Sequence, residues 1–231
     1  MRNVSIILIL ITLWLSSCQK RSKSVTGEVS IDSQQVDVVK VHETSAPPVH
    51  ELDKYLYTDT LYVNDADELL TIQNGLPKGG MIDPDGTPYQ DASGKSYQFA
   101  VFWTRLVNES NKPIDIHVST PADSFAIFTP PNSYLKLFLV PDEFSYQELS
   151  SFNYGLADIK SFLDINFNRG TELQITLEAN EDHIFYIATI SYQAAGVPRG
   201  AFILKGNDLY YSMSLAPDGS GMVYCGGIEV N

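Results

Sequence analysis

Short runs of alternating apolar and polar residues follow one another over most of the chain, and one run is apolar at both sets of alternate positions. This run covers residues 97–107, and one of its faces is apolar at Tyr97, Phe99, Val101 and Trp103. Its other face is apolar at Ala100, Phe102 and Leu106. A strand with two apolar faces lies in the centre of a sheet or between two layers. We therefore predict a central strand here.

A strand with one solvated face is predicted directly after this central strand. Residues 108–113 favour a turn, and Ile114, Ile116 and Val118 then alternate with polar residues. Such alternation is typical of an antiparallel strand with the core on one side and water on the other. His117 stands at a polar position, and no second histidine lies at ligand spacing. We therefore predict a solvent-facing side chain for His117 rather than a metal ligand.

Eight further segments show strand-like patterns. They are residues 59–63, 125–128, 134–140, 172–177, 184–192, 201–204, 209–215 and 222–225. Residues 205–208 join two of them as a predicted hairpin, and residues 217–220 form a predicted turn. Residues 74–96 carry eight glycine and proline residues, so a long loop is predicted there.

One segment has the period of a helix instead. Phe152, Leu156, Ile159 and Leu163 recur at the spacing of one helix face, which predicts a single helix between the strands. The strands and this one helical insertion predict an all-β fold, an antiparallel β-sandwich of immunoglobulin-like type. Residues 99–118 resemble immunoglobulin-like modules of bacterial envelope proteins. This resemblance of fold implies no chemistry.

The first residues of the chain have the features of an export signal. Arg2 supplies a positive end, and residues 4–15 form an apolar run that only Ser5 and Thr12 interrupt. The run has about twelve residues, whereas a membrane-spanning helix needs about twenty. We therefore predict a signal peptide at residues 1–17 rather than a transmembrane anchor.

The signal ends in Leu15-Ser16-Ser17-Cys18, which resembles the lipobox of bacterial lipoproteins. The resemblance implies that Cys18 carries lipid and becomes the first residue of the mature chain. Two or more acyl chains anchor a protein stably to a membrane, at about 0.8 kcal/mol for each buried methylene. The alternative is an ordinary secretory signal that ends near a cysteine. Residues 153–164 also resemble a stretch of uncharacterised bacterial lipoproteins, which supplies no function.

The residues after Cys18 concern the destination of the protein. Gln19 is not aspartate, the residue that retains lipoproteins in the inner membrane, so the resemblance implies the outer membrane. No acidic residue occurs before Glu28, whereas some surface-exposed lipoproteins carry acidic residues just after the cysteine. A location facing the periplasm is therefore favoured over the cell surface.

Aromatic residues mark the boundary between a tether and a folded domain. All thirteen tyrosines and all eleven phenylalanines lie between Tyr55 and Tyr224. Residues 18–50 have little to bury and are predicted to be a flexible tether, with an edge strand at residues 36–41 and a stiff linker at residues 46–48. Residues 51–231 are predicted to form the β-sandwich domain.

The net charge and the cysteine content argue against a nucleic-acid partner and against an internal disulfide. Removing residues 1–17 takes away Arg2 and no acidic residue, so the mature chain has 14 basic and 28 acidic residues and a net charge of −14. This charge argues against nucleic acid as a partner, because phosphate contacts need clustered lysine and arginine. Cys225 is the one cysteine after Cys18, so no disulfide within the lipidated chain is expected. We predict that Cys225 is buried and unreactive.

One group of carboxylates is a candidate metal site. Asp83, Asp85 and Asp91 surround a glycine at Gly86, and calcium prefers such oxygen ligands. The spacing does not match an EF-hand, because its glycine and closing glutamate positions fall on Pro88 and Gly94. The sequence therefore favours a plain turn over a calcium loop and predicts no other cofactor.

No catalytic residues can be assigned from sequence motifs. Ser133 and Lys136 have the spacing of a known serine nucleophile motif, but that motif opens a helix and this segment alternates as a strand. The sequence therefore favours a non-enzymatic envelope lipoprotein that binds a protein or glycan partner or supports an assembly. The alternative is an envelope hydrolase whose catalytic groups are scattered over loops. Carboxylates with perturbed pKa values in a deep pocket would favour the hydrolase, and a shallow aromatic patch would favour the binding module.

Overall fold

The computed structural model describes residues 49–63, 69–126, 133–193, 200–213 and 221–230. The chain divides into two units, Met1–Thr44 and Ser45–Asn231, and every described residue belongs to the second unit. The predicted signal peptide, the lipidation site at Cys18, the edge strand at residues 36–41, the linker at residues 46–48 and the turn at residues 217–220 lie outside the described residues.

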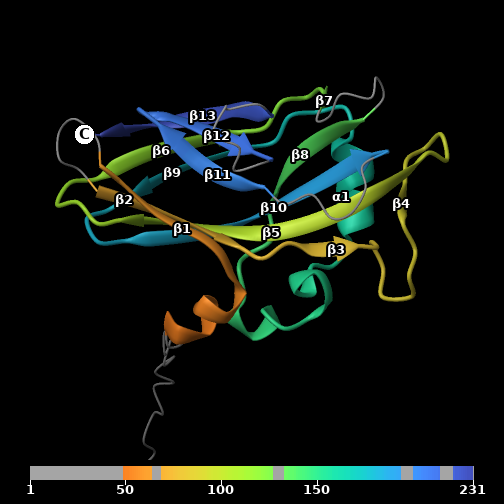
Figure 1. Cartoon of the computed structure of the whole chain (residues 1–231), viewed down its shortest axis with the longest axis horizontal. Helices are drawn as coiled ribbons and strands as arrows, with labels where there is room; N and C mark the ends of the chain where they lie inside the picture. Colours follow the sequence, from red (N-terminus) through yellow and green to blue (C-terminus); the bar gives the residue numbers. More distant parts are fainter. Residues whose placement is uncertain (1–48, 64–68, 127–132, 194–199, 214–220, 231) are drawn as a thin grey trace, which may run out of the picture. The chain divides into compact units, whose positions relative to one another are not determined.

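Two antiparallel sheets make up the domain, and Figure 1 shows one above the other. The first sheet has the order β1-β2-β5-β10-β8-β7, and β3 and β4 also pair with β5. Its strands are β1 (Leu56–Val63), β2 (Leu69–Gly75), β3 (Lys78–Gly80), β4 (Tyr89–Gln90), β5 (Ser96–Asn108), β7 (Phe125–Ala126), β8 (Tyr134–Val140) and β10 (Asp182–Tyr192). The second sheet has the order β11-β12-β13-β6-β9. Its strands are β6 (Ile114–Ser119), β9 (Glu172–Leu177), β11 (Ala201–Lys205), β12 (Asp208–Ser212) and β13 (Met222–Val230).

The predicted fold class, an all-β sandwich with one short helical insertion, is confirmed. One hydrophobic cluster fills the space between the sheets, where Phe102 of β5 and Ile187 of β10 lie in the same cluster as Ile116 of β6 and Cys225 of β13. Cys225 is fully buried, as predicted, and burial raises the pKa of its thiol to about 12. The alternation predicted for β6 is also confirmed, because Ile116 is fully buried while His117 is exposed.

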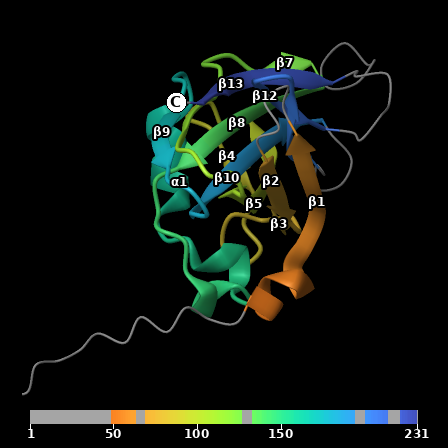
Figure 2. The same cartoon turned by 90° about the vertical axis from the view of Figure 1, so that its left-hand side faces the viewer.

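A second hydrophobic cluster covers the other face of the first sheet. Tyr97, Phe99, Val101 and Trp103 of β5 belong to it, so the prediction of a central strand with two apolar faces is confirmed. The cover comes from four short helical segments: η1 (Val49–Tyr55), η2 (Tyr146–Glu148), η3 (Phe152–Gly155) and α1 (Ile159–Asn166). Figure 2 shows these segments beside the first sheet from a second side.

The long loop predicted at residues 74–96 is wrong in part. β2 extends to Gly75, and β3 and β4 pair with β5 inside this segment. Asn74 is 1% exposed, and its side chain accepts a hydrogen bond from the backbone N–H of Phe202 at 2.9 Å and donates to the carbonyl of Phe202 at 3.1 Å. These two bonds join β2 to β11. Asparagine is typical of turns, but here its side chain links the two sheets.

The predicted helix is present, but it begins at Ile159 rather than at Phe152. Asn153, Tyr154 and Asp158 have positive φ angles of 45°, 58° and 51°, which interrupt a right-handed helix and separate η3 from α1. Leu163 is fully buried as the spacing predicts, but Phe152 is 44% exposed. No helix among the described residues has the length and hydropathy that crossing a membrane requires.

Candidate functional site

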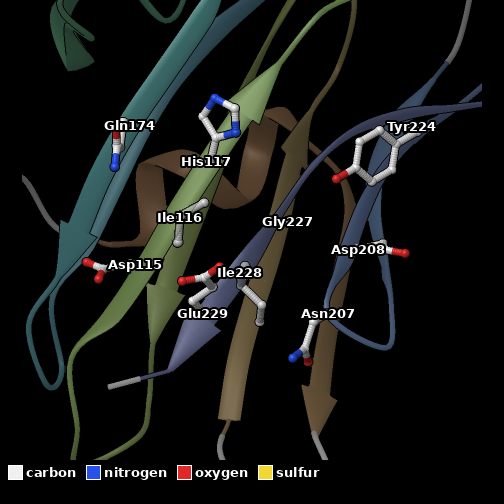
Figure 3. Close-up of a pocket in the computed structure, with 10 residues that line it drawn as sticks. All are labelled: Asp115, Ile116, His117, Gln174, Asn207, Asp208, Tyr224, Gly227, Ile228 and Glu229. Carbon is white, nitrogen blue, oxygen red and sulfur yellow. The ribbon is translucent and has the colours of Figure 1, made fainter.

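The candidate site is an open depression of about 480 Å³ on the outer face of the second sheet. Figure 3 shows its lining residues on β6, β9 and β13 and on the hairpin between β11 and β12. Seven polar side chains line it: Asp115, His117, Gln174, Asn207, Asp208, Tyr224 and Glu229. The predicted hairpin at residues 205–208 is confirmed by the pairing of Lys205 with Asp208, and it supplies one wall.

Two consecutive glycines in β13 create the depression. Gly227 pairs with His117 of β6 on one side and with Asp208 of β12 on the other, so the row across the three strands lacks a central side chain. Gly226 has a φ of 106°, and a Cβ there would lie 2.0 Å from the carbonyl oxygen of His117. Neither a side chain nor an ordinary strand conformation fits at Gly226, so the close approach of β13 to β6 requires glycine.

A pair of aromatic side chains, one of them exposed, borders the gap. Tyr224 is 57% exposed, and its ring packs edge-on against Tyr210 of β12 with 5.8 Å between the ring centroids. Figure 3 shows the Tyr224 hydroxyl on the side of the ring nearer to His117 and Gly227. The Tyr210 hydroxyl donates a hydrogen bond of 3.4 Å to Asp208. An aromatic ring with one apolar face and one polar tip is typical of binding surfaces.

The remaining lining groups are hydrogen-bond donors and acceptors. Asp115 accepts a bond of 2.5 Å from the Thr176 hydroxyl, and His117 lies 3.8 Å from a carboxylate oxygen of Glu172. Gln174 and Asn207 contribute amides, while Asp208 and Glu229 contribute exposed carboxylates. The described lining includes no lysine or arginine, so the depression disfavours anionic ligands.

A second depression, of about 630 Å³, is lined by the end of β8, the starts of β9 and β10 and the loop at residues 141–144. Burial and, to a smaller extent, the charge of Asp158 raise the pKa of Asp142 there. Burial lowers the pKa of His183 at the start of β10. Arg105 donates a hydrogen bond of 2.8 Å to Asp182 at the same end of β10. This depression is where a hydrolytic site would have to be sought.

The three aspartates of the candidate calcium site accept hydrogen bonds within turns, which is the alternative that the sequence favoured. Asp85 accepts hydrogen bonds from the N–H and hydroxyl of Thr87 at 3.0 and 2.6 Å, which lower the pKa of Asp85. Asp91 accepts bonds from Ser93 and Tyr97. The carbonyl of Asp83 accepts a turn bond of 3.1 Å from the N–H of Gly86. Within the described part of the chain, no group of three or more histidine, cysteine, aspartate or glutamate side chains could hold a metal ion.

Ser133 and Lys136 have structural partners. The Ser133 hydroxyl donates to the carbonyl of Tyr192 at 3.3 Å. The Lys136 ammonium donates to the carbonyls of Ala122 and Arg169, and it is 4% exposed on β8. A buried ammonium with carbonyl acceptors ties two loops to the sheet. The geometry therefore gives these residues a role in packing.

Sequence reasoning missed the depression. It assigned His117 and Asp115 to a solvated face, but it did not connect them with Tyr224 or Asn207. The available signal was Gly226-Gly227 inside a strand, which marks a bulge or a close approach of backbones. Comparison of the chain with protein-family models, curated proteins and solved structures finds no match.

Proposed function

We propose that this protein is a lipoprotein of the bacterial cell envelope that acts as a non-enzymatic binding module. The lipobox at Leu15-Ser16-Ser17-Cys18 supports attachment through acyl chains on Cys18. Gln19 and the absence of acidic residues before Glu28 support a location in the outer membrane, with the domain facing the periplasm. The acidic domain is repelled by anionic lipid headgroups, so it stands off the membrane surface.

The outer-face depression is the proposed binding site for a protein or glycan partner. The observation that carries this proposal is Tyr224, a large aromatic side chain that is 57% exposed beside the gap at Gly227. Exposed aromatic groups with nearby amides and carboxylates bind partners through ring contacts and hydrogen bonds. The described lining offers no serine, cysteine or lysine as a nucleophile. Covalent catalysis through a serine, cysteine or lysine nucleophile is therefore disfavoured at this lining.

The hydrolase alternative rests on the second depression. Asp142 has a raised pKa and His183 a lowered one, and such groups in a depression are candidates for acid–base catalysis. Within its described lining, this depression offers no serine, threonine, cysteine or lysine side chain. A hydrolase here would therefore use its carboxylates and His183, either as acid and base for attack by water or as nucleophiles.

Affinity capture of the lipidated protein from intact envelopes tests the proposed function. Wild-type protein and a control variant, Ile165→Ala, should capture the same partner, because Ile165 is 65% exposed on α1 and lies outside the depression lining. Tyr224→Ala should lose that partner, and His183→Gln should retain it. If Tyr224→Ala captures the partner as well as the wild type does, the site is assigned wrongly. If only His183→Gln loses it, the second depression is the binding site instead.

A further inference from the structure

Among the described strands, β1 is an edge strand of the first sheet. β1 pairs with β2 along its whole length, from Leu56 opposite Gly75 to Val63 opposite Leu69. β1 ends the strand order of the first sheet, and no described strand lies on its other side. Figure 2 shows β1 at the side of the folded domain. In an antiparallel sheet, alternate residues direct their N–H and C=O groups to opposite neighbours, so half of those on β1 point away from β2.

Several of the devices that block a sheet edge are missing from this strand. β1 has eight residues and contains neither lysine nor proline, and its one irregularity lies at its start, between Leu56 and Thr58. Two of the other edges differ from β1: β7 has only two residues, and on β11 the Asn74 side chain occupies both backbone groups of Phe202. Proteins normally protect long edges because unpaired backbone groups recruit another strand.

The exposed side chains of β1 are those that a strand added beside it would contact. Leu61 is 52% exposed and Val63 is 58% exposed, and both stand on the same face of the strand as Asp59. Tyr62 points to the opposite face, where it packs against the cluster between the sheets. Asp59 accepts one hydrogen bond of 3.2 Å from Gln73, and its carboxylate remains exposed. The outer face of β1 therefore presents one negative charge followed by two aliphatic side chains.

We propose that β1 binds an extended segment of another protein by antiparallel strand addition. The segment carries lysine or arginine opposite Asp59 and apolar residues opposite Leu61 and Val63. Main-chain hydrogen bonds supply the affinity, and the alternate side chains supply the specificity. A second copy of this chain fits less well, because β1 has no basic residue to place opposite Asp59 and two mature chains of charge −14 repel each other. This surface belongs to the first sheet and is independent of the depression on the second.

Peptide titrations of the full-length lipidated protein in detergent test this proposal. The probe is a blocked, dye-labelled peptide with valine, isoleucine and lysine opposite Val63, Leu61 and Asp59, and with threonine between them. One comparison peptide has glutamate in place of lysine, and another is N-methylated at alternate residues so that one edge cannot form hydrogen bonds. Fluorescence anisotropy should show saturable binding of the probe, with both comparison peptides at least about tenfold weaker.

Charge reversal and matched variants define the register. Asp59→Lys should prefer the glutamate peptide, because the sign of the pair is exchanged. Leu61→Lys should abolish binding, whereas Ile165→Lys, at another exposed aliphatic residue, should leave it unchanged. Thermal melting checks that each variant is folded.

Three outcomes would overturn the proposal. Equal binding of the N-methylated peptide would mean adsorption to an apolar patch. If the probe shows no saturable binding up to about 1 mM, β1 does not bind an extended segment by strand addition. A wild-type dimer that Leu61→Lys dissociates would identify a second copy of the chain as the occupant.

Discussion

Truncation of Trp103 to alanine should be among the most destabilising single changes in this domain. Trp103 is fully buried on β5, and its ring packs edge-on against Phe144 with 6.3 Å between the centroids. A Cβ built on Gly75 would lie 2.4 Å from the Trp103 ring nitrogen, so the neighbouring strand approaches this ring closely. Because β2 and β10 hold β5 from both sides, the backbone cannot close the cavity that truncation leaves.

The expected cost follows from the buried area. A buried tryptophan removes about 150–250 Å² from water, which at about 25 cal/mol per Å² corresponds to about 4–6 kcal/mol. This figure is an upper bound because the unfolded chain is partly compact, so we expect about 3–5 kcal/mol. A typical domain is stable by about 5–15 kcal/mol, and the variant should therefore lose a large share of its stability.

His117→Ala, in the next strand along the chain, β6 of the second sheet, is the control. The side chain is 52% exposed, and its nearest charged partner, Glu172, is 3.8 Å away and 81% exposed. Exposed pairs of this kind contribute little, so the free energy of unfolding should change by about 0.5 kcal/mol or less. Urea unfolding followed by far-ultraviolet circular dichroism measures both variants. Equal costs for Trp103→Ala and His117→Ala would refute the assignment of strand faces.

The remaining predictions concern the anchor, the turns and one histidine. Cys18→Ser should abolish lipid labelling and release the protein from membrane fractions, and a variant that still fractionates with membranes would contradict the lipobox assignment. Calcium chelation should leave the melting temperature unchanged, whereas a decrease that is absent in Asp85→Ala would show that the loop binds calcium. Burial holds the pKa of His183 below its ordinary value of 6.5, so the unfolded chain binds this proton more readily. The free energy of unfolding should therefore fall as the pH drops below about 6.5, and His183→Gln should flatten that part of the pH profile.

Strands with clear alternation or with two apolar faces could be predicted from the sequence, and β2 could not. In β6 the burial of each side chain follows the apolar pattern, and in β5 it does so at every residue from Ser96 to Trp103. In β2 the inward positions are Leu70, Ile72 and Asn74, and Asn74 with Gly75 is typical of a turn. The asparagine is tolerated in the interior because Phe202, Thr104 and Thr58 satisfy its side chain. Those partners lie on three other strands, which local sequence does not reveal.

Glycine explains why the candidate site could not be predicted either. A Cβ at Gly79 would lie 2.3 Å from the carbonyl oxygen of Phe99, and one at Gly226 would lie 2.0 Å from that of His117. At both positions glycine lets one strand approach another, although glycine in a sequence more often indicates a loop. The close approach at Gly79 allows β3 to pair with β5 where a loop was predicted. The close approach at Gly226 lies beside the depression at Gly227 and Tyr224. Because each contact joins residues far apart in the chain, the sequence pattern identifies the glycine and only the fold identifies its role.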